Sequence, residues 1–445
     1  MTIVQLNVSD YGSTGAVMQN IRRIALCKGY NAVSFVGRRS HSPDDSEKIG
    51  HAADMYAHGF WARIGKNGHG SVHSTKKLTK DLYRLNPDVV ILHNLHGYYI
   101  NLKELFDCLC RLKSTHVFWV LHDCWAFTGS CAYYSSVKCR KWEITQSGET
   151  DGLNGSNCFS CPIHNKTYPK SFIDSAAREF KFKRELFTRL DDITLIAPSE
   201  WLAAEIRRSF LRKYNTVIIN NGVNIDVFKP RSSKECTKVL KKYNISCDKP
   251  IILGVASVWD DRKQPELFFK LANIAKDCTV LMVGLSEKQM RTLPENVGGI
   301  LRTENTEELS CLYSAASVLL NPSLEDNFPL VPLEALACGT PVITSALCGC
   351  AEQVDYNTGV ILSNPTSVNE AFRAVKTVID ARKDAALLSI KEIDKAKFST
   401  DLCRRRALQY YDYYKMAAKY MELIEKAYVT DRCGRLPDEE ALLTV

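Results

Sequence analysis

The most informative segment of the chain is Asn321-Pro-Ser-Leu-Glu-Asp-Asn-Phe-Pro-Leu-Val-Pro-Leu-Glu-Ala-Leu-Ala-Cys-Gly-Thr-Pro-Val342. It runs from the end of a predicted strand through a loop into a short helix and the next strand. Asp326 lies in the loop, and Glu334 lies eight residues later in the first turn of the predicted helix, where the helix dipole favours a carboxylate. Both carboxylates can accept hydrogen bonds from sugar hydroxyls, and amides at the helix start can meet a diphosphate. A capped helix after a turn explains Glu334 alone, but not the whole segment.

The same alternation of β-rich runs and helical patterns extends along the chain, as is typical of parallel α/β sheets. In the first half we expect strands at Ile3–Val8, Ala32–Gly37, Val89–His93, His116–His122, Thr194–Ala197 and Val217–Asn220, with helices at Ala16–Lys28, Thr75–Leu85, Leu102–Leu112, Ser171–Arg189 and Glu200–Ser209. The pattern restarts after residue 250 with strands at Ile251–Ala256, Thr279–Val283, Gly299–Arg302, Ser317–Leu320, Pro341–Thr344 and Gly359–Leu362. No sequence repeat links the two halves.

This pattern divides the chain into two domains. The stretch from Asn221 to Pro250 contains an Asn-Gly turn and two prolines and predicts a linker at 222–250. We therefore expect a first domain at 1–221 with an irregular Cys-rich insert at about 128–169, the linker at 222–250, a second domain at 251–400, a crossing helix at 401–428 and a tail at 429–445.

Composition excludes several classes of protein. The chain has 445 residues, 45% hydrophobic and 24% charged, which is ordinary for a soluble globular protein. Its formal net charge of +8 is too small for its length to indicate nucleic-acid binding. We find no apolar run long enough to span a membrane and no secretion signal, and we expect a reducing cytoplasm for the 17 cysteines.

Polar motifs follow the predicted strands of the first half. Asp10-Tyr-Gly-Ser-Thr-Gly15 leads from the first strand into a helix, and its glycines allow backbone amides to approach an anion, although the spacing is not that of a dinucleotide fingerprint. His122 follows a buried strand, which favours a functional role over a structural one. For His93 and His96 the two interpretations are equally open. Two doubly wound domains are expected to bind a ligand between such strand ends.

Taken together, these motifs resemble those of family-4 retaining glycosyltransferases of the GT-B fold, and most closely the bacterial colanic-acid type. The resemblance also covers Asn86-Pro-Asp-Val-Val-Ile-Leu-His-Asn-Leu-His-Gly-Tyr-Tyr-Ile-Asn101, His122-Asp-Cys-Trp-Ala-Phe-Thr-Gly129, Pro198-Ser-Glu-Trp-Leu-Ala203 and Asn220-Asn-Gly-Val-Asn-Ile-Asp-Val-Phe-Lys-Pro230. It extends from the first strand to about Tyr428. It implies an α/β protein with two Rossmann-like, doubly wound domains that face a central cleft, and a C-terminal helix that crosses back to the first domain.

The resemblance also implies roles for individual residues. Catalytic roles fall to His122 beside the donor sugar, Lys263 on the diphosphate leaving group and Asp326 on the sugar hydroxyls. The donor would further be bound by Gly12, Gly15, Arg262, Glu325, Phe328, Leu330 and, at its ribose, Glu334. Two positions depart from the family pattern. Glu325 adjoins Asp326, so either carboxylate can reach the sugar, and Arg262 lies closer to Lys263 than is usual for the basic pair.

The implied reaction is transfer of a hexosyl unit, with retention, from a UDP- or GDP-type nucleotide sugar to a glycan or polyprenyl-linked oligosaccharide in bacterial surface polysaccharide synthesis. No cofactor is expected for catalysis, because family members of this fold generally need no metal. Two alternatives are a starch- or sucrose-type transferase that acts on soluble sugars, and a noncatalytic sugar-nucleotide-binding subunit of a polysaccharide assembly complex.

The insert contains four cysteines, Cys131, Cys139, Cys158 and Cys161, the last two in a Cys-x-x-Cys pair. This spacing permits a tetrahedral structural zinc site, although the first pair is wider than common zinc spacings. Structural zinc and unliganded thiols are both open, and disulfides are less favoured in a reducing cell.

The segment Lys170–Arg189 combines basic and aromatic residues at helical spacing. Such a helix can lie on an anionic membrane surface, or it can pack its apolar face on the domain. We therefore expect a cytoplasmic protein with a candidate peripheral contact on the cytoplasmic face of the inner membrane.

Overall fold

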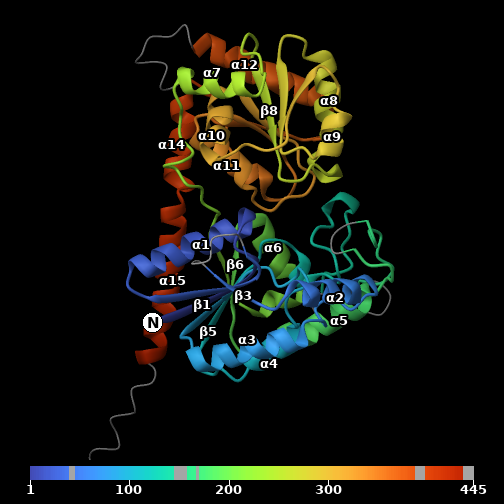
Figure 1. The fold of residues 1–445 in the computed structure, drawn as a ribbon, viewed down its shortest axis with the longest axis vertical. Coiled ribbons are helices and arrows are strands. Elements are labelled where there is room, and N and C mark those ends of the chain that lie inside the picture. Colours follow the sequence, from blue (N-terminus) through green and yellow to red (C-terminus); the bar gives the residue numbers. More distant parts are fainter. Residues whose placement is uncertain (40–45, 145–157, 167–169, 386–395, 434–445) are drawn as a thin grey trace, which may run out of the picture.

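The computed structural model describes residues 1–39, 46–144, 158–166, 170–385 and 396–433, and these form two α/β domains stacked end to end (Figure 1). The first domain is built on a parallel sheet of order β3-β2-β1-β4-β5-β6-β7. Its strands are β1 (Thr2–Ser9), β2 (Asn31–Arg38), β3 (Glu47–Lys48), β4 (Val89–Leu92), β5 (His116–Val120), β6 (Thr194–Ala197) and β7 (Thr216–Ile218). Its helices are α1 (Gly12–Cys27), α2 (Ala52–Arg63), α3 (Val72–Leu85), α4 (Leu102–Leu109), α5 (Ala176–Phe187) and α6 (Glu200–Arg208).

The second domain has a parallel sheet of order β10-β9-β8-β11-β12-β13. Its strands are β8 (Ile251–Val255), β9 (Thr279–Val283), β10 (Val297–Ile300), β11 (Val318–Asn321), β12 (Val342–Ser345) and β13 (Gly359–Leu362). Its helices are α7 (Ser233–Lys242), α8 (Pro265–Ile274), α9 (Glu287–Arg291), α10 (Thr306–Ala315), α11 (Leu330–Ala337) and α12 (Val368–Ala385). The expectation of two doubly wound parallel sheets is confirmed.

Both sheets form because their central strands are short apolar runs that are buried on both faces. All four residues of β4, Val-Val-Ile-Leu, are buried, and so are those of β11. The strand order reverses between β1 and β4 in the first sheet and between β8 and β11 in the second. Ligands of doubly wound sheets bind at such reversals, beyond the carboxyl ends of the strands.

The segment expected to be a linker, 222–250, contains a helix. α7 begins with a capping box, in which Ser232 and Glu235 satisfy each other's backbone amides. It lies against α10, and Lys242 near its end pairs with Glu304 and Glu308. This part of the segment is therefore a component of the second domain.

The single crossing helix expected at 401–428 is wrong in detail, because the chain forms two helices, α14 (Thr400–Tyr410) and α15 (Tyr413–Cys433). α14 packs on α11 of the second domain and α15 packs on α1 of the first. Figure 1 shows both helices running along one side of the molecule. The break has a clear cause. The backbone of Val223 donates to Tyr411 (2.7 Å) and accepts from Tyr413 (3.1 Å), and this pairing replaces helical hydrogen bonds.

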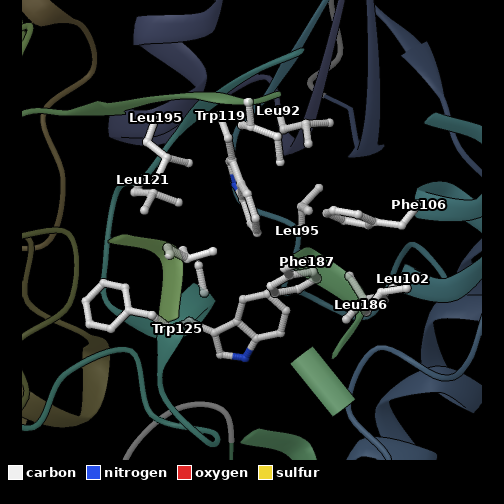
Figure 2. Close-up of a cluster of buried hydrophobic side chains, with 14 of the residues drawn as sticks. Leu92, Leu95, Leu102, Phe106, Trp119, Leu121, Trp125, Leu186, Phe187 and Leu195 are labelled. Atoms are coloured by element: carbon white, nitrogen blue, oxygen red, sulfur yellow. The ribbon is translucent and has the colours of Figure 1, made fainter. Parts of the chain in front are cut away.

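The apolar face of α5 belongs to the core of the first domain. Figure 2 shows Leu186 and Phe187 of this helix among side chains from the sheet and from α4. The Phe187 ring lies 4.8 Å from that of Phe106 and 4.9 Å from that of Trp119, centroid to centroid. For α5 itself, the packing interpretation therefore holds. Phe172 and Ile173, which precede the helix, are exposed.

The helices of the described residues include none with the length and apolar character that crossing a membrane requires.

We predict that Gly222→Ala destabilises the crossing between the domains. A Cβ atom at Gly222 would lie 2.5 Å from the Cα of Tyr413, which is backbone and cannot rotate away. Overpacking of this kind costs about 1–3 kcal/mol and should lower the melting temperature. Gly59→Ala is the matched control, because its Cβ would meet Tyr98 at an ordinary 3.7 Å. Equal melting temperatures of the Gly222→Ala and Gly59→Ala variants would contradict the prediction.

Candidate active site

The candidate site lies where the carboxyl ends of the two sheets face each other. His122 follows β5 of the first domain. From the second domain come Lys263, in the short 3-10 helix η4 (Asp261–Lys263), and Asp326, in the loop after β11. The sequence predicted all three, and the structure brings them to the same junction.

Lys263 and Asp326 form an ion pair. The Lys263 Nζ lies 2.6 Å from Asp326 Oδ2 and donates a second hydrogen bond to the buried Ser323 Oγ at 3.1 Å. Ser323 in turn donates to Asn321 at the end of β11. The lysine is therefore held by the loop that follows β11. Among the described residues its charge is paired with one carboxylate, that of Asp326, so an incoming anion can compete for it.

Arg262 is bound to a carboxylate and an aromatic ring. Its guanidinium group donates twice to Asp260 Oδ2, at 3.0 and 3.1 Å, and lies 4.9 Å from the ring centroid of Tyr133 in the first domain. Its carbonyl accepts from the Leu324 amide at 2.9 Å. Arg262 thus orients the loop that carries Asp326.

Two residues beside Asp326 bind the first domain directly. Asn327 Nδ2 donates to the backbone carbonyl of His122 at 2.6 Å. The Ser136 amide donates to Glu325 Oε1 at 2.7 Å. Sequence left open which of the two adjacent carboxylates meets a ligand. In the structure Glu325 is buried in the contact between the domains, whereas Asp326 remains beside Lys263.

The side chain of His122 is held by a chain of hydrogen bonds. Gln5 Nε2 donates to the Met18 carbonyl, so its Oε1 is the atom that faces His93 Nε2 at 3.1 Å. His93 therefore carries its proton on Nε2, and its Nδ1 accepts from His122 Nε2 at 3.1 Å. This leaves Nδ1 as the unprotonated nitrogen of His122.

Burial keeps both of these imidazoles neutral. It lowers the pKa of His122 to about 4, against a smaller opposing effect of Asp123, and it lowers the pKa of His93 well below its ordinary value. His122 is consequently a hydrogen-bond acceptor near neutral pH.

His96 belongs to a separate pair. Its Nε2 lies 2.7 Å from Asp123 Oδ2, and the other oxygen of Asp123 accepts from the Trp125 amide. Burial alone would raise the pKa of Asp123, but His96 and the amide hold it below its ordinary value. His96 therefore shapes the loop after β5, and of the two undecided histidines His93 is the one bonded to His122.

Glu334 lies one turn further into α11 than expected. The helix begins at Leu330, so Glu334 is its fifth residue and the prediction of a first-turn position was wrong. Burial raises the pKa of Glu334 to about 7, although the hydroxyl of Tyr313, which donates to Oε2 at 2.7 Å, opposes that shift. The carboxyl group is therefore poised to change its charge near neutral pH.

The start of α11 presents backbone amides to the site. Among the described side chains none caps this helix, whose first turn contains no acidic residue. The preceding Phe328 is buried, and its carbonyl accepts from Asn221 of the interdomain connection. Leu330 and its neighbours thus leave a partial positive charge at the helix start.

Gly12 and Gly15 lie at the start of α1. Gly12 has φ of +73°, and a Cβ there would meet nothing within 4 Å. At Gly15 a Cβ would lie 2.4 Å from the backbone of Asp10, so this glycine allows the helix to turn tightly after β1. Their predicted contact with phosphate stays a prediction.

The cysteine cluster lies apart from these groups. Cys131, Cys139, Cys158 and Cys161 are all free, and all contact the core of the first domain. Burial raises the pKa of Cys131 to about 12, and Cys158 accepts from the Gly129 amide at 3.1 Å. In the part of the chain that the structure describes, no three His, Cys, Asp or Glu side chains are arranged to hold a metal ion. As they stand the thiols do not form a ligand set, and elemental analysis of the protein tests the zinc prediction.

Sequence reasoning missed several residues of the site. Asn327, Ser323, Tyr313 and Tyr133 make the contacts that hold the predicted residues in place. Asn327 and Ser323 lie within the segment Asn321–Val342, so their place in the sequence already indicated that they lie near the site. Tyr133 and Tyr313 come from distant parts of the sequence, and no local pattern marks them.

Comparison with known proteins places this site in context. A family model described as glycosyl transferases group 1 matches residues 249–381. The chain is 26% identical to the putative colanic acid biosynthesis glycosyl transferase WcaC of Escherichia coli K12, over 78% of this chain and 79% of that protein. It is 30% identical to the D-inositol 3-phosphate glycosyltransferase of Geodermatophilus obscurus, over 75% and 80%. HepE of Anabaena, solved with UDP-glucose, shares the fold with a TM-score of 0.62, 14% identity and coverage of 96% and 100%.

We predict that nucleoside diphosphate affinity rises with pH because Glu334 must lose its proton to accept hydroxyl hydrogen bonds. With a pKa of about 7 in the free protein, affinity should increase about tenfold between pH 6 and pH 8. Calorimetry with UDP and GDP measures this. In Glu334→Gln, the affinity should change between pH 6 and pH 8 only through the nucleotide's own ionisation. If the variant keeps the full pH dependence of the unaltered chain, Glu334 is not part of the binding site.

We also predict that His122 stays neutral down to about pH 5, with its proton on Nε2. NMR of protein labelled with ¹⁵N-histidine distinguishes the two ring nitrogens directly. In His93→Leu the Nε2 proton loses its acceptor, and both tautomers should appear. In His93→Asn the side-chain oxygen can replace that acceptor, and the single tautomer should return. A midpoint for His122 near its ordinary 6.5 would refute the assignment.

Proposed function

This chain belongs to the group 1 family of glycosyltransferases, and on that basis we propose that it transfers a hexosyl unit from a nucleotide-sugar donor to a glycan acceptor in bacterial surface polysaccharide synthesis. The name of the Escherichia coli relative, which refers to colanic acid biosynthesis, supports the polysaccharide assignment. The UDP-glucose complex of HepE supports a nucleotide sugar of the UDP type, and GDP remains the alternative base.

The observation that carries this proposal is the group formed by Lys263, Asp326 and His122 at the junction of the two sheets. Lys263 supplies a positive charge for the leaving diphosphate, and it can exchange its described carboxylate partner, Asp326, for that anion. Asp326 is then available to accept from sugar hydroxyls. Asn327 Oδ1, buried and without a partner among the described residues, is a further acceptor beside the His122 backbone.

The remaining donor contacts follow from the elements already described. Glu334 accepts from the ribose hydroxyls, and amides near Phe328 and Leu330 meet the diphosphate at the start of α11. Gly12 and Gly15 line the phosphate side from the first domain.

The chemistry assigned to this site is cleavage of the bond between the anomeric carbon and the diphosphate oxygen. The acceptor hydroxyl oxygen then bonds to that carbon on the same face, which retains the configuration, and its proton passes to the departing diphosphate oxygen. Charge develops on the departing diphosphate and on the sugar ring. The protein contributes mainly by positioning the two substrates and by stabilising the diphosphate with Lys263 and the amides of α11. Because these groups supply positive charge, we expect turnover without added divalent metal.

The acceptor that we propose is a polyprenyl-linked oligosaccharide at the cytoplasmic face of the inner membrane. Its recognition requires features outside the donor site, and we expect them in the first domain, which we assign to the acceptor side.

A nucleotide panel followed by a transfer assay tests the proposed function. Thermal melts with UDP, GDP, ADP, CMP and dTDP identify the base, since a ligand at 100 times its Kd adds about 2.7 kcal/mol to stability. Transfer is then measured with sugars on that base, and NMR of the product reports the anomeric configuration. Binding without turnover would favour a noncatalytic subunit, and transfer to soluble glucans a starch-type enzyme. A product with inverted anomeric configuration would contradict the retaining mechanism.

We predict that Lys263→Ala lowers kcat about 100-fold, the order found for one lost donor to a developing oxyanion, while the Kd for the nucleoside diphosphate changes much less. Lys270→Ala, an exposed lysine on α8, is the matched control for loss of charge. Equal losses in binding and in kcat would make Lys263 an anchor for the ground state only.

A further inference from the structure

A cavity of about 620 Å³ lies in the first domain between α2 and the ends of β1 and β2. This volume is typical of a ligand pocket. Tyr11, which contributes to its wall, immediately follows the turn after β1, and Tyr98 follows β4. The cavity therefore opens at the same edge of the first sheet as His122, on the side of β2 and β3. None of the residues assigned to the donor lines it.

One face of α2 forms a wall of this cavity. The lining residues of the helix are Ala52, Met55, Tyr56, Gly59, Phe60 and Arg63. Their spacing is that of a single helical face. Tyr56 is 81% exposed and Phe60 63% exposed, so these two rings on this face of α2 are largely open to solvent. Two large aromatic side chains on one exposed face indicate a binding surface.

The charged residues that line the cavity are all basic. Arg38, Arg39 and Lys48 line the wall opposite α2, and Arg63 lines the end of the helix. No Asp or Glu is among the lining residues, and the described residues provide no carboxylate partner for these four side chains. Four cations that have no carboxylate partner in the described part of the chain favour an anionic occupant, and arginine in particular suits phosphate groups.

The apolar face continues beyond the cavity. Phe172 and Ile173 are both exposed, and the Phe172 amide donates to the carbonyl of Arg63 at the end of α2 at 2.7 Å. This places the two segments side by side. Exposed aromatic residues next to Arg and Lys are typical of surfaces that lie in a membrane interface. α2 is at the edge of the first domain away from α15, where a membrane can reach it (Figure 1).

We propose that this cavity binds the diphosphate end of a polyprenyl-diphosphate-linked acceptor, with the diphosphate between Arg38, Arg39, Lys48 and Arg63 and the adjoining isoprenoid chain along Tyr56 and Phe60. This inference rests on the proposed function, because it places the acceptor's lipid end beside the edge of the sheet that carries His122. The oligosaccharide extends from the cavity toward the donor site, while the lipid chain leaves along the exposed face of α2 into the bilayer.

The test is sedimentation of the full chain with phosphatidylcholine vesicles that contain undecaprenyl diphosphate. Vesicles of phosphatidylcholine alone, and vesicles with phosphatidylglycerol at equal surface charge, are measured beside them. Inorganic diphosphate is titrated separately by calorimetry. We expect binding to the undecaprenyl diphosphate vesicles to be at least about tenfold tighter than to the phosphatidylglycerol vesicles. Equal binding to both anionic vesicles would overturn the site, because general surface charge would then explain it.

Two pairs of substitutions separate the charged part of the cavity from the apolar part. Arg39→Ala with Arg63→Ala should weaken binding of both inorganic diphosphate and the lipid vesicles by about tenfold or more. Tyr56→Ser with Phe60→Ser should weaken vesicle binding and leave inorganic diphosphate unchanged. Lys77→Ala with Lys80→Ala on α3 removes the same charge from an exposed helix outside the cavity and should change neither. Vesicle binding that survives both cavity pairs would refute the proposal.

The donor site provides the remaining control. All three pairs should bind the nucleoside diphosphate of the thermal-shift panel as the unaltered chain does, because no donor residue is changed. If the unaltered chain binds no nucleotide but still prefers undecaprenyl diphosphate vesicles, the proposed transfer reaction fails and the lipid site stands. If it binds nucleotide but shows no such preference, the lipid site fails and the transferase proposal stands.

Discussion

The hydrogen bond from Asn327 to the backbone carbonyl of His122 is the contact on which the arrangement of the candidate site depends. It joins the loop after β11 to the loop after β5 and so brings the functional ends of two separate sheets together. Its neighbour Glu325 accepts from Ser136 and supports the same junction. The buried Oδ1 of Asn327 has no partner among the described residues. An unpaired buried acceptor costs about 1–3 kcal/mol, and a ligand hydroxyl that donates to it would remove that cost.

The two C-terminal helices also hold the domains together. α14 belongs to the second domain and α15 to the first, and the chain between them pairs with Val223 of the interdomain connection. Gly222 permits this approach because any side chain there would collide with the backbone of Tyr413. The chain thus passes between the domains twice at one point, which restricts how the domains can move relative to each other.

Burial determines the electrostatic character of the site. It keeps His122 neutral and an acceptor, and it raises the pKa of Glu334 to about 7. Lys263 and Asp326 remain partly exposed and retain complementary charges. His122 is therefore an acceptor near neutral pH, whereas Glu334 changes between its protonated and charged forms there. The group assigned to the leaving diphosphate is Lys263, which can exchange its carboxylate partner for that anion.

The prediction from sequence succeeded where the pattern was local. β6, β9 and β13 have the predicted bounds, and each other expected strand differs by only a few residues. α2 was missed because only His58 and Ala62 among its residues are buried, so it lacks the apolar stripe of a packed helix. The break at 411–412 was missed because it depends on pairing with Val223, almost 200 residues away in the sequence.

The sequence by itself determined the two parallel sheets and the set of polar side chains that follow their strands, because strand periodicity and strand-end loops are properties of neighbouring residues. Only the tertiary structure decided which of these side chains meet. In the tertiary structure Lys263 pairs with Asp326, and Glu325 bonds across the junction between the domains. His93 and Gln5 set the tautomer of His122. One face of α2 lies open beside four cations. These outcomes depend on contacts between segments far apart in the chain, whose geometry no local pattern encodes.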